Sequence, residues 1–199
     1  MLLVDIIGSG TLYCEVDEEK AAARVQELKD LLRETIENYD GDIREQVGEE
    51  FMACFPTPRV ALDAAHRMQA LVAERAPGNS GNPYLGIRIG LHHGPLDVNA
   101  PFDNSDTLWV AKRMVNHAEN QQVLTTRSTR ELVTKVDRYK FKARDHHDPD
   151  MYEENLTMQE LLWEEITEHL PHVMIKVGGE EYKLTDEDEP QLICRAGQW

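Results

Sequence analysis

The stretch from Gly41 to Pro56, GDIREQVGEEFMACFP, decides the fold class of this chain. Strand-forming residues lie on both sides of a Gly-Glu-Glu turn, which predicts two strands, over 43–47 and 51–55, joined as a hairpin. Pro56 ends the second strand because proline cannot donate a hydrogen bond to a strand ladder. The hairpin therefore carries acidic residues at its tip, among them Glu49.

The segments on either side of this hairpin complete a pattern. Leu2 to Ile7 is a short apolar run, which predicts a buried strand, and apolar residues at helical spacing follow from about 17 to 38. After the hairpin, the spacing predicts a helix over about 60–72 and alternation predicts a strand over 85–91. The order β-α-β-β-α-β is the ferredoxin-like arrangement, so we expect an α+β fold, an antiparallel sheet with helices on one face.

The rest of the chain extends this unit and adds an appendage. Residues 172–184 contain two apolar runs around Gly178-Gly179, which predicts a β-hairpin. We therefore expect one domain over 1–168 and a C-terminal hairpin extension over 169–199. Between the two, the patterns predict a helix over 107–119, a strand over 123–126, a short helix capped by Ser128, a strand within 156–163, and loops over 77–83, 99–106 and 144–154.

Charge and composition exclude several classes of protein. The formal net charge is −16 and no cluster of Lys or Arg is present, which argues against nucleic-acid binding. No apolar run approaches the roughly 18 residues that span a bilayer, and the N-terminus lacks the pattern of a secretory signal. We therefore expect a cytoplasmic protein that does not enter the membrane. A nucleotide carried by a divalent metal remains compatible with the acidic surface, because the metal supplies positive charge locally.

Two features of the sequence could carry chemistry. Asp5 lies in an apolar run, where a carboxylate is costly unless it is compensated. It could bind Mg²⁺ or Mn²⁺ at a strand end, together with the hairpin acids Glu49 and Glu50, or lie at a strand edge and point to water. The segment Gly8-Ser9-Gly10-Thr11 could present backbone N–H groups to phosphates, or be a flexible connection, and it lacks the lysine of a P-loop.

Five segments, taken in order, cover roughly residues 2–166: Leu3–Ser9 (LVDIIGS), Gly41–Pro56, Ile87–Pro95 (IRIGLHHGP), Asp106–Thr126 (DTLWVAKRMVNHAENQQVLTT) and Glu160–Glu164 (ELLWE). Together they resemble the class III nucleotidyl cyclases. The resemblance implies a cyclase homology domain that pairs head to tail with a second copy and forms its active sites at the interface. It further implies that two metal ions activate the ribose 3′-hydroxyl, which attacks the α-phosphate to give a cyclic nucleotide and pyrophosphate.

The resemblance also assigns roles to individual residues. It implies metal ligation by Asp5 and by Glu49, which stands where the family usually has Asp, and it makes Arg113 the arginine that stabilises charge on the phosphates. Trp109 replaces the asparagine that positions the ribose. The resemblance implies that Glu45 reads the base, since guanylate cyclases have a Glu at this position, and that Phe102 is the second base-reading position. The other substrate contacts that it implies are Trp109 and the phosphate loop Gly8, Ser9, Gly10 and Thr11.

Two hypotheses about function follow. The first is a cyclase homologue in cyclic-nucleotide signalling, acting on a nucleoside triphosphate as a homodimer, with turnover weakened or lost because of Trp109 and Glu49. The alternative is a non-catalytic module that binds a nucleotide or serves in dimerisation and regulation. The sequence does not decide which nucleotide base the substrate carries, and pyrimidine nucleotides are among the alternatives. The C-terminal extension faintly resembles the opening strands of a forkhead-associated domain, so it is either a plain hairpin or the truncated start of such a domain.

Overall fold

The computed structural model describes residues 1–75, 84–96, 105–133, 138–144 and 156–166 and the strands at 173–177 and 180–184. The chain divides into two compact units, Met1–Thr167 and Glu168–Trp199, and each is described by itself. The elements of the first unit are β1 (Leu2–Ile7), α1 (Ser9–Glu15), α2 (Glu18–Asn38), β2 (Asp42–Val47), β3 (Glu50–Cys54), α3 (Pro58–Arg75), β4 (Gly86–Leu91), α4 (Asp106–His117), β5 (Val123–Thr126), α5 (Arg127–Glu131), β6 (Phe141–Ala143), β7 (Met158–Leu161) and the 3₁₀ turn η3 (Trp163–Glu165).

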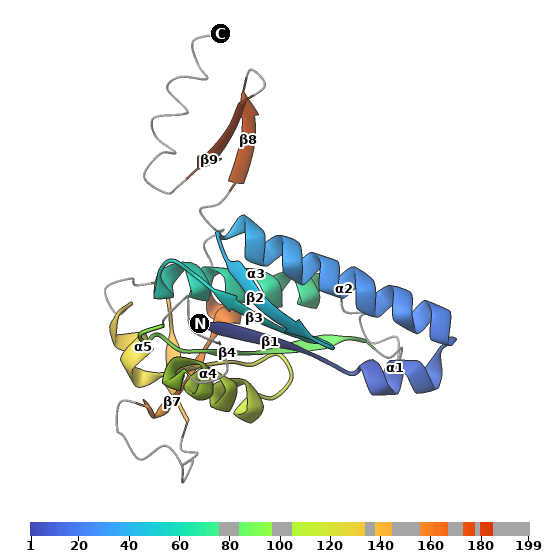
Figure 1. Cartoon of the computed structure of the whole chain (residues 1–199), viewed down its shortest axis with the longest axis horizontal. Coiled ribbons are helices and arrows are strands. Elements are labelled where there is room, and N and C mark those ends of the chain that lie inside the picture. Colours follow the sequence, from blue (N-terminus) through green and yellow to red (C-terminus); the bar gives the residue numbers. More distant parts are fainter. Residues whose placement is uncertain are drawn as a thin grey trace. The chain divides into compact units, whose positions relative to one another are not determined.

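The first unit is built on a seven-stranded sheet with the strand order β2-β3-β1-β4-β5-β7-β6 (Figure 1). The α+β fold class predicted from the sequence is confirmed, with the ferredoxin-like order running from β1 to β4. One pair departs from the expected antiparallel sheet, because β4 and β5 run parallel, with Ile89 opposite Val123. A parallel pair needs a long crossover connection, and here the crossover contains α4.

Helices cover both faces of the sheet, so the expectation of helices on one face is wrong for α4. Helices α2 and α3 lie on one face and α4 on the other (Figure 1). The side chain of Leu3 packs against Ala111 and Val115 of α4. Gly90, opposite Leu3 on β4, lets the helix come this close: a Cβ on Gly90 would lie 2.1 Å from the backbone nitrogen of Val115. The backbone of α4 therefore rests directly on β4.

The segment after β1 is a helix, not the loop that its glycines predict. Ser9 to Thr11 form the first turn of α1, whose only buried side chain is Leu12. Gly8 precedes the helix in the left-handed region, with φ at 95°, and a Cβ there would lie 2.8 Å from the carbonyl oxygen of Tyr84. Glycine is required at this one position, because both its backbone conformation and the neighbouring strand exclude a side chain.

Two further details correct the sequence expectations. Thr126, not Ser128, caps α5, since its Oγ1 accepts a hydrogen bond from the backbone nitrogen of Thr129 at 3.4 Å. Strand β6 was not predicted; it pairs with β7 from Phe141 to Ala143. The predicted loop 77–83 and most of 99–106 and 144–154 lie outside the described residues.

In the second unit, β8 (Val173–Val177) and β9 (Glu180–Leu184) pair antiparallel, with Val177 opposite Glu180. None of the helices in the described ranges is both long enough and apolar enough to cross a membrane.

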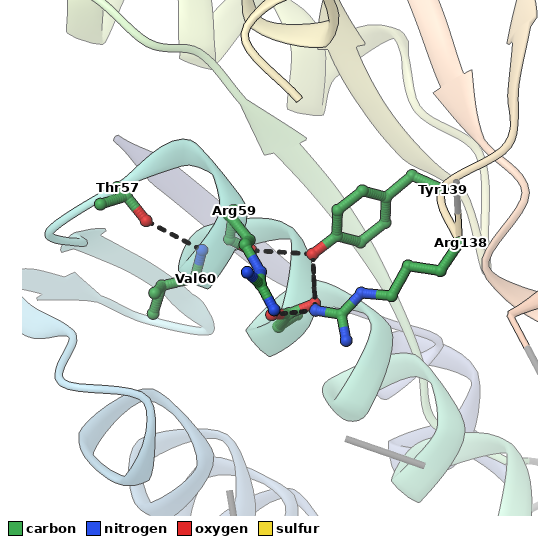
Figure 2. Close-up of polar contacts among 6 residues, drawn as sticks. Thr57, Arg59, Val60, Arg138 and Tyr139 are labelled. Carbon is green, nitrogen blue, oxygen red and sulfur yellow. Dashed lines mark hydrogen bonds and ion pairs between the residues drawn. The ribbon is translucent and has the colours of Figure 1, made fainter. Parts of the chain in front are cut away.

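A buried ionic network fastens α3 to the segment that leads into β6 (Figure 2). Arg138 donates hydrogen bonds to both carboxylate oxygens of Asp63, and the Tyr139 hydroxyl donates to the same carboxylate. The side chains of Arg138 and Asp63 are only 8% and 3% exposed. Burial raises the pKa of the Asp63 carboxyl, while the hydrogen bond from Tyr139 and the charge of Arg138 act in the opposite direction. Because water hardly reaches this pair, each charge is stabilised by the opposite charge of its partner.

His92, at the end of β4, is the second buried polar junction. Its Nδ1 lies 2.8 Å from Oγ1 of Thr126, which is also 2.9 Å from Oγ1 of Thr129. Thr129 in turn accepts a hydrogen bond from the backbone nitrogen of His93 at 2.9 Å. This closed chain of partners joins β4, β5 and α5. Burial lowers the pKa of His92 to about 4, so the imidazole is neutral at physiological pH.

We expect His92 to make the domain sensitive to acid. An unfolded histidine has a pKa near 6.5, so between about pH 6.5 and 4 the unfolded chain binds a proton that the folded chain does not. Acidification through this window therefore favours unfolding, by about 3 kcal/mol for this one group. Urea unfolding at pH 7, 5.5 and 4.5 measures the loss. His92→Asn should remove most of this loss of stability, and His93→Asn, at the exposed neighbour, should not. If the unfolding free energy fell equally with pH in wild type and both variants, the assignment to His92 would be contradicted.

Candidate active site

Asp5 lies in the middle of the sheet and is held by an ion pair. Its strand, β1, runs between β3 and β4, and Asp5 is directly opposite Glu50 on one side and Arg88 on the other. Arg88 donates to Oδ2 of Asp5 from Nε at 2.9 Å and from Nη2 at 2.8 Å. Asp5 thus pairs with Arg88 and does not simply point to water, which was the alternative expectation. Arg88 compensates the cost of placing this carboxylate among apolar residues.

The two hairpin acids occupy different places. Glu50, and not the predicted Glu49, is the acid that the strand register sets opposite Asp5. Glu49 stands in the turn after Gly48, where its carbonyl oxygen accepts a hydrogen bond from the backbone nitrogen of Ile6 at 3.4 Å. Burial and then the charge of Asp5 raise the pKa of Glu50, and Lys112 of α4 acts in the opposite direction.

The carboxylates of Asp5 and Glu50 suit a hard divalent cation in chemistry and in placement. Magnesium and manganese ions prefer oxygen ligands and commonly take only one or two carboxylates, with water and substrate phosphates completing the shell. The described residues contain no group of three or more His, Cys, Asp or Glu side chains that could hold a metal by themselves. The donor set therefore fits a metal that arrives with phosphate oxygens of its own, not one held in a closed protein cage.

Helix α4 presents Trp109 and Arg113 one turn apart on its outer side. Trp109 is 44% exposed. The guanidinium carbon of Arg113 lies 5.3 Å from the centroid of the Trp109 ring, a cation–π contact. Trp109, which the sequence analysis expects in place of a ribose-positioning asparagine, is thus in contact with the predicted catalytic arginine.

A cleft of about 450 Å³ opens beside the C-terminal half of α4. His117, one turn after Arg113, lines it together with Lys142 of β6 and Arg144. Leu124 and Met158 form its apolar floor, and Arg144 pairs with Glu160 at 3.3 Å. The acidic Glu119 also lines this cleft. The three basic side chains are suited to phosphate groups.

The remaining predicted site residues are spread over the molecule. Glu45 is exposed on β2 opposite Met52, whose side chain packs with Leu3, so Glu45 projects from the same face as α4. Phe102 lies outside the described residues. Gly8 to Thr11 lie at the junction of β1 and α1, directly after the strand that carries Asp5.

Sequence reasoning missed four residues of this site: Arg88, His117, Lys142 and Arg144. It named Glu50 together with Glu49 as an acid of the hairpin tip, but took Glu49 as the metal ligand. A signal for Arg88 was present, since it is the one charged residue in the alternating strand Gly86–Leu91. Lys142 and Arg144 gave none, because a strand of three residues shows no period.

The comparisons with known proteins agree with this architecture. A family model described as the adenylate and guanylate cyclase catalytic domain matches residues 1–152. No curated protein sequence matches. Among solved structures, the adenylyl cyclase CyaB from P. aeruginosa superposes with a TM-score of 0.65 at 15% identity, covering 81% of this chain and 91% of that one.

Two further structures extend the likeness to other cyclases. Adenylate cyclases from Trypanosoma brucei, in their monomeric state, give a TM-score of 0.65 at 20% identity, with 83% of this chain and 89% of that one covered. The guanylate cyclase domain of RhGC from Catenaria anguillulae, in complex with GTP, gives 0.60 at 15% identity, with 80% and 92% covered. At such identities the structures show the fold alone, and the match over residues 1–152 shows the family: the chain belongs to the adenylate and guanylate cyclase catalytic domain family.

Proposed function

We propose that this chain is a nucleotidyl cyclase of weak turnover, which forms a cyclic nucleotide and pyrophosphate from a nucleoside triphosphate in the cytoplasm. The observation that carries the proposal is the division of the candidate site into two parts on one face of the sheet. The Asp5 half-site consists of Asp5, Glu50 and Arg88. The Arg113 half-site consists of Arg113, His117, Lys142 and Arg144.

Helix α4 separates the two half-sites. On one side, residues of α4 pack against Leu3 and Met52, which belong to β1 and β3, the strands that carry Asp5 and Glu50. On the other, Met114 packs against Leu124 and Met158, the floor of the basic cleft. Within one copy of the chain the two half-sites therefore lie on either side of α4 and approach each other at its C-terminal end, where Arg88 donates to the carbonyl oxygen of Ala118, the residue after His117.

A second copy placed head to tail supports the reaction. In a two-fold pair each surface contacts its counterpart reciprocally, so the Asp5 half-site of one protomer can face the Arg113 half-site of its partner, twice. The carboxylates then contribute the negative charge that holds metal, and the arginine, histidine and lysine contribute positive charge to the polyphosphate. This complementarity supports a homodimer as the active form.

Each residue has a distinct task in the proposed reaction. Asp5 and Glu50 would hold the divalent cation, with Glu49 beside them in the turn, and a bound Mg²⁺ or Mn²⁺ would make the ribose 3′-hydroxyl more acidic. Arg113 stabilises the charge that develops on the phosphates. Lys142 and Arg144 bind the polyphosphate and orient it, and Glu45 accepts hydrogen bonds from the base. The ribose loses the hydrogen bonds of an asparagine at position 109, and this loss weakens positioning and hence turnover.

Incubation with Mn²⁺ and each of ATP, GTP, CTP and UTP tests the proposal. We expect slow release of pyrophosphate together with one cyclic product, and no product from Asp5→Asn. The absence of product with all four nucleotides would overturn the catalytic proposal. Trp109 and the Arg88–Asp5 ion pair would then favour the second candidate, a non-catalytic nucleotide-binding or dimerisation module, which calorimetric nucleotide binding would test.

A further inference from the structure

Arg88 pairs with Asp5 through two hydrogen bonds to one carboxylate oxygen. Two donors of one guanidinium, Nε and Nη2, converge on the same oxygen, Oδ2, at 2.9 and 2.8 Å. The side chains are only 29% and 23% exposed, so water screens the attraction less than at an open surface. Any cation that bound this oxygen would have to displace the guanidinium or lie directly beside it.

The guanidinium is also held from a second direction. Nη1 of Arg88 lies 3.4 Å from the carbonyl oxygen of Ala118, the residue that follows α4. Carbonyl groups at the C-terminal end of a helix carry partial negative charge and attract cations. Arg88 is therefore fixed between a carboxylate and a helix end, and its position does not depend on Asp5 alone.

We propose that Arg88 is an internal counter-ion that excludes free divalent cations from Asp5, so that metal enters this half-site only together with a polyphosphate. The inference rests on the proposed function, which makes Asp5 a metal ligand. A metal ion and a guanidinium about 4 Å apart repel each other strongly in a half-buried site. A bound polyphosphate offers the guanidinium other acceptors, since arginine binds phosphate through paired hydrogen bonds. Arg88 thus sets the order of binding: polyphosphate and metal enter together, and metal without polyphosphate is excluded.

Binding of Mn²⁺ alone, measured by electron paramagnetic resonance without nucleotide, tests this device. We expect the wild-type chain to bind weakly at Asp5 and Arg88→Gln to bind at least about tenfold more tightly, because the repulsion is gone. Asp5→Asn in the Arg88→Gln background should abolish the gain. Arg88→Lys, which keeps a positive charge at the site, should bind as weakly as wild type.

Arg127→Gln is the matched control for net charge. Arg127 forms an exposed pair with Glu131, so the substitution removes the same charge at a distance from Asp5, and it should leave Mn²⁺ binding unchanged. Circular dichroism of each variant confirms that it is folded. Equal Mn²⁺ affinity in wild type and Arg88→Gln would overturn the inference, as would a gain that survives Asp5→Asn.

The outcomes separate this inference from the proposed function. A chain that yields no cyclic nucleotide but shows the predicted Mn²⁺ pattern would lose the catalytic proposal and keep the role of Arg88. A chain that makes product and binds free Mn²⁺ tightly at Asp5 would do the reverse.

Discussion

Replacing Asp63 by asparagine is expected to lower the free energy of unfolding by about 3–5 kcal/mol. The substitution keeps the shape of the side chain but removes the charge that solvates Arg138, whose own side chain is 8% exposed. The guanidinium of Arg138 then stays buried between α3 and the segment before β6, with no opposite charge to compensate it. Urea unfolding followed by circular dichroism measures the change, and an unchanged m-value would show that it reflects stability.

Two controls isolate the ionic contribution. Arg138→Met alone should cost a similar amount, because it leaves the Asp63 carboxylate buried without its partner, and Asp63→Leu combined with Arg138→Met should recover most of the loss. Glu131→Gln breaks the exposed pair with Arg127 and should cost less than about 1 kcal/mol. If Asp63→Asn lowered the free energy of unfolding no more than that exposed control, the buried network would not stabilise the fold as its burial indicates.

The second large effect is on catalysis in mixed dimers. With the nucleotide that the wild-type chain turns over, Arg113→Ala should reduce kcat about 10²–10³-fold, the usual cost of losing one group that stabilises transition-state charge. Asp5→Asn should remove the metal-dependent reaction altogether. Because the two residues belong to different half-sites, an equal mixture of the two variants should regain about a quarter of the wild-type activity: half the dimers are mixed, and each of those has one intact site of two.

Pyrophosphate release from the separate and mixed proteins measures this recovery. The control mixture combines Arg113→Ala with Lys142→Ala, two changes in the same half-site, and it should recover nothing. Failure of the Asp5→Asn and Arg113→Ala mixture to rise above its components would place both residues in one copy's site and remove the argument for head-to-tail pairing.

Much of the fold follows from local patterns in the sequence. Alternation of Ile87 and Ile89 with polar or small neighbours predicts β4, and the helical spacing of Val25, Leu28 and Leu32 predicts α2, because each pattern repeats over several residues. The position of α4 on the opposite face was not predicted. It depends on the contact of Gly90 with a helix more than 20 residues later, which no local pattern contains.

The candidate site was harder to predict because it depends on strand register. A shift of one residue decides whether Glu49 or Glu50 stands opposite Asp5, and the turn geometry that sets this shift is not written in residue types. Arg88 meets Asp5 across 83 positions of sequence. The charge within the apolar strand did indicate that Asp5 needs a partner, but not which residue supplies it.

The two outermost strands have a consequence for assembly. Strand β6 has only three residues and carries Lys142, while β2 is mostly exposed and has a bulge between Ile43 and Glu45. Short, charged or irregular borders deter another chain from adding a strand, a common route to aggregation. The two borders of the sheet are therefore protected from lateral growth, so a pairing of two copies such as the one proposed above would not need to compete with strand addition at these borders.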